Sequence, residues 1–335
     1  MSRIGPGGGW RRLAVRGVAV PATWLALALP GELRGQEAGF GARCVVQGAT
    51  VEAQQLCGAM AQALEVAQPL FGLAASGGNP VPGTASTLGM RIGRIPRVSV
   101  AGRFTVVWVD LPPALRESSE RKLEFTARTL NVDGAAGLFR GFSPAPTVGG
   151  VGSIDILGSI GHLSVPDREF GDNSAVTWGL GARVGILRES FLLPGVSVSA
   201  MYRRVGDLTL GDPTLLETDA FGRLGHISVW SFRGAVSKRV AGLGATAGLG
   251  YDRYSSDVRV GARDLASVVS TDDFDNGRVS AFANISWTLL ILHIVGELGW
   301  QEGADRVPVV SPGSIRIDPE DGKFFGSLAI RLSIW

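Results

Sequence analysis

The sequence has 335 residues, of which 48 are glycine and 19% are charged, and its formal net charge is +2. Glycine at about twice its usual ~7%, without a period of three, excludes collagen, and a positive mean hydropathy with few charges excludes intrinsic disorder. After the N-terminus no apolar run approaches the ~20 residues that a membrane-spanning helix needs, which excludes a helical membrane protein.

Residues 1–36 have the pattern of a secretory signal peptide. Four arginines between residues 3 and 16 precede an apolar run, 17–29, which ends in a Pro-Gly pair. This run is too short for a permanent anchor, although an N-terminal membrane anchor stays open as the alternative. Cleavage removes five arginines and one glutamate and changes the net charge to −2. The basic pI therefore does not indicate nucleic-acid binding, and we expect no nucleic-acid partner.

The next segment, 37–67, is expected to be a small disulfide-linked helical unit. Cys44 and Cys57 are the only cysteines, and an even count at short spacing in an oxidising compartment predicts one disulfide. Leu56, Met60 and Leu64 recur every four residues, which predicts a helix over about 51–66. This helix could cap the periplasmic mouth of a barrel or plug its lumen. No histidine lies near the cysteines, so we expect no metal and no cofactor.

From residue 68 onward the chain alternates between apolar and polar residues. In residues 97–109 the even positions are apolar, as at Phe104 and Trp108, and most odd positions are polar, as at Arg103. Successive side chains of a strand lie on opposite faces, so this pattern predicts one apolar and one polar surface. The same alternation recurs in residues 176–186, 196–203, 278–289 and 330–334.

Strand length and aromatic position favour a transmembrane barrel over a secreted β-sandwich or soluble barrel. The segments exceed the usual ~5–6 residues of globular strands, and tryptophan or tyrosine stands near several of their ends. Short connections are expected near 95–96, 240–241 and 289–290, and long outer loops at 110–122, 208–223, 259–275 and 303–322. With a crossing strand at Gln68–Ser76 and another at Thr87–Ile95, we expect about twelve antiparallel strands. In the competing arrangement the N-terminal segment threads through the lumen.

These alternating segments and the C-terminal aromatic residue Trp335 resemble the outer-membrane β-barrel proteins of Gram-negative bacteria, over residues 68–335. The resemblance implies a place in the bacterial outer membrane, with its lipids and the barrel-assembly machinery as partners. The last strand departs from the family pattern, because its apolar residues 328, 330, 332 and 334 lie on the other parity from Trp335. A helix followed by Gly78-Asn79-Pro80 faintly resembles the fatty-acid transporter barrels, which carry an N-terminal hatch and an early Asn-Pro.

Enzyme chemistry has one weak candidate, a His-x-Ser pair that occurs as His162-Leu163-Ser164 and as His226-Ile227-Ser228. Positions i and i+2 share a strand face, as a serine nucleophile and its base require, and lipid A deacylase barrels resemble this arrangement. Parity places both pairs on the lipid side, so no catalytic residue is assigned. A lipid hydrolase remains an alternative, since a bulge would reverse the parity.

The other candidate site is the lumen. By parity the inward set comprises Arg91, Arg97, Arg103, Arg183, Arg203, Arg233, Arg278, Arg331, His293 and Glu297. Inward acids are fewer, with Asp155 and Asp252 besides Glu297. The arginines and acids either brace a small barrel as hydrogen-bonded pairs or form a positive lining that favours anions. We expect passive passage or uptake of a small anionic or amphipathic solute, with a structural or adhesive barrel as the alternative.

Overall fold

The computed structural model of the protein describes residues 50–90, 96–111, 123–145, 148–165, 170–172, 174–211, 220–262, 269–303 and 322–334. All of these residues belong to one compact unit, Ala38–Trp335. The predicted signal peptide, Cys44 and Trp335 lie outside the described residues.

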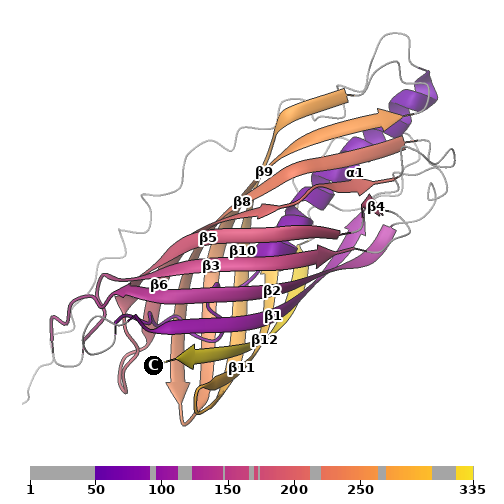
Figure 1. Cartoon of the computed structure of the whole chain (residues 1–335). Coiled ribbons are helices and arrows are strands. Elements are labelled where there is room, and N and C mark those ends of the chain that lie inside the picture. The colour runs from indigo at the N-terminus through magenta and orange to yellow at the C-terminus, as the bar shows by residue number, and fades with distance from the viewer. Residues whose placement is uncertain are drawn as a thin grey trace, which may run out of the picture. The chain divides into compact units, whose positions relative to one another are not determined.

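The described residues form one helix and twelve strands (Figure 1). Their bounds are α1 Val51–Ser76, β1 Val98–Leu111, β2 Leu123–Phe139, β3 Ser153–Ser164, β4 Phe170–Asp172, β5 Ser174–Leu187, β6 Gly195–Val205, β7 Leu208–Leu210, β8 Ala220–Val240, β9 Leu243–Ala262, β10 Val269–Leu289, β11 Leu292–Gln301 and β12 Lys323–Ile334. Antiparallel pairing runs in the order β8-β6-β5-β3-β2-β1-β12-β11-β10-β9, and β9 pairs back onto β8. Ten of the described strands therefore close a barrel, while the short β4 and β7 lie outside the ring and pair with each other.

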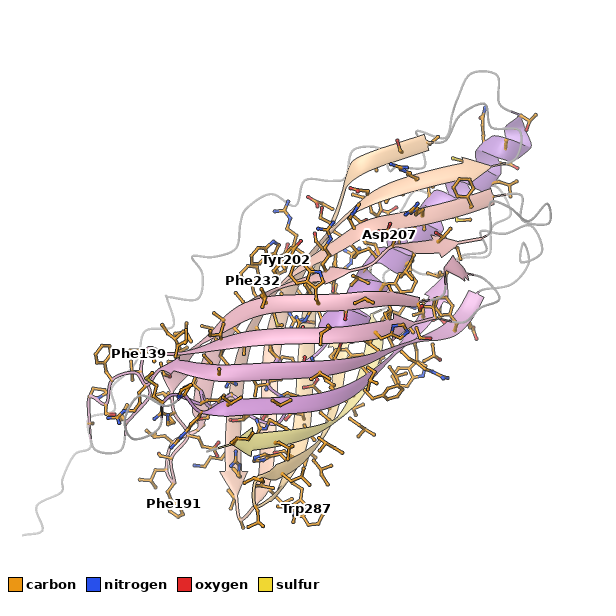
Figure 2. All side chains as sticks on the ribbon, in the orientation of Figure 1. Phe139, Phe191, Tyr202, Asp207, Phe232 and Trp287 are labelled. Carbon is orange, nitrogen blue, oxygen red and sulfur yellow. The ribbon has the colours of Figure 1, made fainter. Side chains whose placement is uncertain are left out.

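The barrel wall has an apolar outer face and, over much of its length, a polar inner face. On β1, Phe104 and Trp108 are 43% and 52% exposed, whereas Arg103 and Thr105 are buried. Figure 2 shows aromatic side chains such as Trp287 and Phe232 on the outside of the wall. A closed ring leaves no unpaired strand edge, and an apolar outer belt suits lipid and not water. The predicted antiparallel transmembrane barrel of the outer membrane is confirmed, and a soluble sandwich is excluded.

The two ends of the barrel differ in how the strands are connected. At one end, two-residue turns at 241–242 and 290–291 join β8 to β9 and β10 to β11, as predicted, and residues 140–152 and 188–194 form the other two connections. Ala241, Gly242 and Leu290 have φ values of 49°, 86° and 55°, the left-handed conformation that tight hairpins require. We call this end the short-turn mouth and the opposite end, flanked by connections 112–122, 206–219 and 302–322, the long-loop mouth. Short turns face the periplasm in outer-membrane barrels, so the long-loop mouth faces the outside.

The helix α1 is longer than predicted, and the predicted strand at Gln68–Ser76 is wrong. The helix begins where the Thr50 side chain accepts a hydrogen bond from the Ala53 N–H at 3.2 Å, and it continues past Pro69 to Ser76. A short apolar run fits a buried strand and a buried helix equally well by periodicity. Surrounded by the wall, this run meets no free strand edge, and a helix satisfies its own backbone groups.

The predicted strand Thr87–Ile95 is also wrong in its described part. Within residues 87–90 the structure has only an isolated bridge between Met90 and Pro96, and residues 91–95 lie outside the described ranges. The wall begins at Val98, so this predicted crossing does not contribute to the ring.

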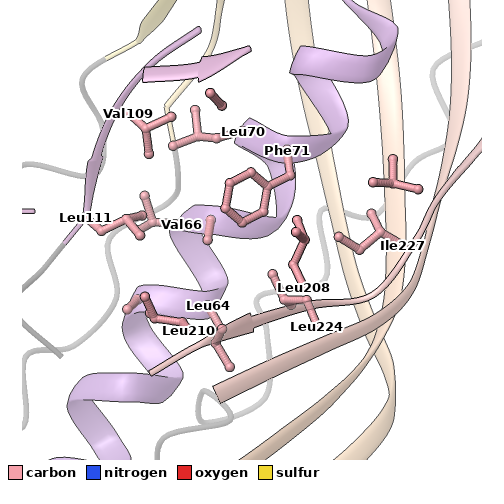
Figure 3. Close-up of a cluster of buried hydrophobic side chains, with 14 of the residues drawn as sticks. Leu64, Val66, Leu70, Phe71, Val109, Leu111, Leu208, Leu210, Leu224 and Ile227 are labelled. Atoms are coloured by element: carbon pink, nitrogen blue, oxygen red, sulfur yellow. The ribbon is translucent and has the colours of Figure 1, made fainter. Parts of the chain in front are cut away.

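The helix lies inside the barrel, where it packs against inward-facing side chains of the wall (Figure 3). Phe71 and Leu64 are each 1% exposed and belong to the same buried cluster as Leu111 on β1 and Leu224 on β8. Each such side chain stabilises the folded state by about 1.5–3 kcal/mol through burial. The inner face therefore becomes apolar towards the long-loop mouth, whereas strand parity had predicted a polar inner face throughout. No helix among the described residues is both long enough and apolar enough to cross a membrane.

Candidate functional site: the plugged lumen

The lumen is occupied by α1 and by residues 77–90, which together we call the plug. Near the long-loop mouth, Gly222 of β8 lies against Met60: a Cβ built on Gly222 would be 2.7 Å from the Met60 sulfur. Near the short-turn mouth, a Cβ built on Gly89 would be 2.4 Å from Nη2 of Arg188. The plug therefore runs through the lumen from the outer mouth to the periplasmic mouth, and α1 begins at the outer one.

Three of the predicted lumen arginines form buried ion pairs with carboxylates of neighbouring strands. The pairs are Arg103–Asp133 at 2.9 Å, Arg183–Asp155 at 2.8 Å and Arg233–Asp252 at 2.8 Å. All six side chains are at most 5% exposed. A buried charge is tolerated when it is paired and hydrogen-bonded, so these pairs are part of the packed interior.

The same arginines also hold the main chain of the plug. Arg103 donates to the carbonyls of Gly77 and Asn79 at 3.0 and 3.2 Å. Arg183 donates to the Thr84 carbonyl at 3.2 Å. The Nη1 atoms of the two arginines thus satisfy backbone oxygens of a non-helical segment, 77–84, that is not part of a strand.

Asp155 fixes the periplasmic end of the plug. Its carboxylate accepts hydrogen bonds from the backbone N–H groups of Leu88, at 3.0 Å, and Gly89, at 3.2 Å, besides its ion pair with Arg183. Because all these donors converge on one fully buried carboxylate, loss of its charge would leave several groups unpaired at once.

Glu297 on β11 fixes the middle of the plug. It accepts from the Asn79 N–H at 3.1 Å, from Nδ2 of Asn284 at 3.0 Å and from the Ser327 hydroxyl at 3.4 Å. Gly78 has a φ of +79°, and a Cβ there would lie 1.5 Å from Oε1 of Glu297. The close approach of the plug to this carboxylate therefore requires glycine at position 78.

Within the apolar part of the lumen, Gln68 supplies the polar contact between helix and wall. Its amide donates to the Ser256 hydroxyl at 2.8 Å and to the Phe274 carbonyl at 2.6 Å, and it accepts from Nδ2 of Asn276 at 2.6 Å. A fully satisfied amide in an apolar environment fixes the depth and rotation of the helix.

The other predicted lumen residues are placed as follows. Arg203 donates to the Ser231 hydroxyl at 3.5 Å and Arg278 to Oδ1 of Asn276 at 3.2 Å. Arg331 and His293 are each 2% exposed, and Arg97 is half-buried at the foot of β1. Arg91 lies outside the described residues.

Two features of the lumen were missed from the sequence. Asp133 shares the inward parity of β2 with Asn131, so strand alternation would have placed its carboxylate in the lumen. The bonds to the plug main chain had no sequence signal, because they join residues up to 218 positions apart.

The two His-x-Ser pairs lie on the outside of the wall. His162 and Ser164 are exposed on β3. At the second pair a bulge interrupts β8, His226 has a φ of 53°, and its Nδ1 lies 2.8 Å from Oδ2 of Asp257. The Ser228 hydroxyl instead donates to the Ser255 carbonyl at 3.4 Å. At this bulge the histidine and the serine therefore bond to different partners and not to each other.

Asp207, in the connection between β6 and β7, joins this exposed cluster at the long-loop mouth. Partial burial raises the pKa of Asp207, but hydrogen bonds from the His226 N–H and from Arg223 outweigh it and hold the pKa below its ordinary value. Over the described part of the chain, no three His, Cys, Asp or Glu side chains gather in a way that could hold a metal ion.

Only one of the two cysteines of the predicted disulfide is among the described residues. Cys57 is fully buried on the second turn of α1, while Cys44 lies outside the described residues. The Cys44–Cys57 pairing therefore stays a prediction.

Comparison with known proteins finds likeness in structure alone. No protein-family model and no curated protein sequence matches the chain. Similar solved structures include the translocator domain of the autotransporter NalP from Neisseria meningitidis, at 10% identity and a TM-score of 0.43, over 71% of this chain and 86% of that one. The toluene transporter TbuX from Ralstonia pickettii matches at 10% identity and a TM-score of 0.30, over 78% and 99%. Scores this low carry no argument about function.

Proposed function

We propose that this outer-membrane barrel lets a small anionic or amphipathic solute cross the membrane when its plug shifts. The observation that supports this is the bonding of the lumen charges to the plug main chain. Arg103, Arg183 and Glu297 bind backbone groups that water can replace, so the plug can leave without stranding them in an apolar environment. Once exposed, the same side chains line a wet passage.

The distribution of polarity along the lumen supports the class of solute. The inner face is apolar near the long-loop mouth, around Leu111 and Leu224, and charged nearer the short-turn mouth, around Arg183 and Arg331. The inward arginines outnumber the inward acids, which favours anions in a narrow lumen. An amphipathic molecule with a negative group matches both halves.

Planar-bilayer recordings test the proposal. Glu297→Ala removes the acceptor of the Asn79 N–H, and Glu124→Ala is the matched control because Glu124 is exposed on β2. We expect the parent and the control to open rarely and Glu297→Ala to open often, with a reversal potential in a salt gradient that indicates anion preference. Adding Arg103→Ala with Arg183→Ala should weaken that preference.

The proposal fails if correctly folded Glu297→Ala stays as silent as the parent. That outcome would favour the second candidate, a structural or adhesive barrel without transport. The apolar contact between α1 and the wall is the observation that favours this candidate, since a hydrophobic core around a helix resists displacement. In that case exchange of the outer connections, 212–219 or 263–268, should change cell-surface behaviour while lumen variants do not.

A further inference from the structure

The lumen arginines differ in whether a carboxylate lies beside them. Arg103, Arg183 and Arg233 each have a carboxylate within 2.9 Å. Arg331 on β12 is 2% exposed, yet its Nε and Nη1 have no hydrogen-bond partner among the described residues. The charged groups that act on it most are two further arginines, Arg183 and Arg239.

A second buried nitrogen without a partner among the described residues lies on the neighbouring strand. His293 on β11 is directly opposite Arg331 in the strand register, and both side chains point into the lumen. Side chains opposite each other in an antiparallel pair have Cβ atoms about 4.5–5.5 Å apart. His293 Nδ1 is bonded to the Thr288 hydroxyl at 2.9 Å, while its Nε2 has no partner in the part of the chain that is described.

The bond to Thr288 determines what the imidazole offers. Either atom of this bond can be the donor; when the hydroxyl donates to Nδ1, the ring proton resides on Nε2 and is free to donate to a ligand. Arg331 and Arg239 are the charged groups that act on this ring. Arg239, half-buried on β8, adds a buried Nε without a partner among the described residues.

Two carboxylates near this mouth are bonded to other groups. Asp155 is bonded to Arg183 and to the plug, and Glu189 accepts from the Arg239 backbone N–H. Neither is among the charged groups that act on Arg331. Buried donors without acceptors cost free energy, and an arginine whose charged neighbours are also arginines attracts an anion.

We infer that Arg331, His293 and Arg239 form a binding site for a small oxyanion at the periplasmic mouth of the plugged barrel. The oxyanion completes the hydrogen bonds of Arg331 and His293 and neutralises the arginine cluster. This site is filled while the plug is in place, so it goes beyond the proposed passage and does not depend on it.

Calorimetric titration of inorganic phosphate into the full, refolded chain in zwitterionic detergent tests the site. Chloride at equal ionic strength serves as the reference anion. We expect one phosphate to bind the parent, and Arg331→Gln to weaken binding about tenfold or more, as loss of a charge-assisted hydrogen bond does. Arg331→Lys keeps the charge but loses the guanidinium donors, and it should also weaken binding.

Arg128→Gln is the matched control, because Arg128 is exposed on the outer face of β2 and the variant makes the same change in charge. It should bind phosphate as the parent does. Heat-modifiable gel migration verifies that each variant is folded. Absence of phosphate binding to the parent overturns the inference, as does equal binding by folded Arg331→Gln and Arg331→Lys. The titration measures binding and not flux. A negative titration therefore does not contradict the proposed passage, and silent bilayer recordings do not contradict the phosphate site.

Discussion

A pair of glycines on the same helix offers a direct test of how the plug is seated. Gly72 and Gly58 both belong to α1, but their surroundings differ. A Cβ built on Gly72 would lie 2.3 Å from Cε1 and 2.4 Å from Cδ1 of Tyr254 and 3.2 Å from Cγ2 of Val229. A Cβ built on Gly58 has nothing within 4 Å among the described atoms. The change from glycine to alanine is the same at both sites, so the comparison isolates the contact with the wall.

The expected magnitude follows from two opposing contributions. Alanine in a helix interior is favoured over glycine by up to about 1 kcal/mol, and this gain applies at both positions. At Gly72 the new methyl group must displace a ring that is fully buried and whose hydroxyl is bonded to Gln301. Overpacking of this kind costs about 1–3 kcal/mol. Because the helix contribution cancels, we expect Gly72→Ala to be less stable than Gly58→Ala by about that amount.

Denaturant unfolding in detergent, followed by heat-modifiable gel migration and near-ultraviolet circular dichroism, measures the difference. Gly58→Ala should unfold at or above the parent midpoint, and Gly72→Ala clearly below it. If the plug yields instead of the wall, Gly72→Ala should also open more often in a planar bilayer. Equal midpoints together with equal conductance for the two variants would refute the seating of α1 against Tyr254.

Three further predictions concern charge, orientation and pH. Asp155→Asn should lower the free energy of unfolding by about 3–5 kcal/mol, because it leaves the buried Arg183 charge without its counter-ion. The double variant with Arg183→Met should recover part of this loss, and a loss below ~1 kcal/mol for Asp155→Asn would contradict the buried pair. Val51→Cys, at an exposed position where α1 begins, should react with an impermeant maleimide on intact cells, whereas Leu290→Cys in the short turn should react only after permeabilisation. The reverse pattern would show that the long-loop mouth faces the periplasm. The pKa of Asp207 lies below its ordinary value near 3.8, so its contribution to stability is complete above that pH and is lost as the pH falls through the lowered value. Asp207→Asn should therefore reduce the loss of stability on acidification. If the dependence of stability on pH is the same in the variant and the parent, the pairing of Asp207 with Arg223 is excluded.

Much of the barrel wall was predictable because strand patterning is local. Phe104 and Trp108 alternate with Arg103 within a few residues, and the pleat alone places them on opposite faces. The turns after Val240 and Leu289 were equally local, since the alternating segments end there. The outer-membrane barrel and its orientation follow from such short-range features together with loop length.

The lumen was predictable only in part. Parity places Arg183 and Glu297 inside, but it does not say that their partners are the backbone groups of Thr84 and Asn79. Nor does it distinguish Arg331, on which other arginines act, from Arg103, which forms an ion pair with Asp133. These differences depend on strand register across the ring, and register is set by pairing and not by composition.

By itself the sequence determined the alternation of faces, the short turns and the start of the helix near residue 51, since each depends on neighbouring residues. Only the tertiary structure decided that Gln68–Ser76 is helical, that ten of the described strands close the ring and that the plug fills it. An apolar run such as 70–75 satisfies a strand and a helix equally well until its surroundings are known. Here the surroundings are the inner wall of the closed barrel, and the helix is the conformation that buries this run there with its backbone hydrogen bonds complete.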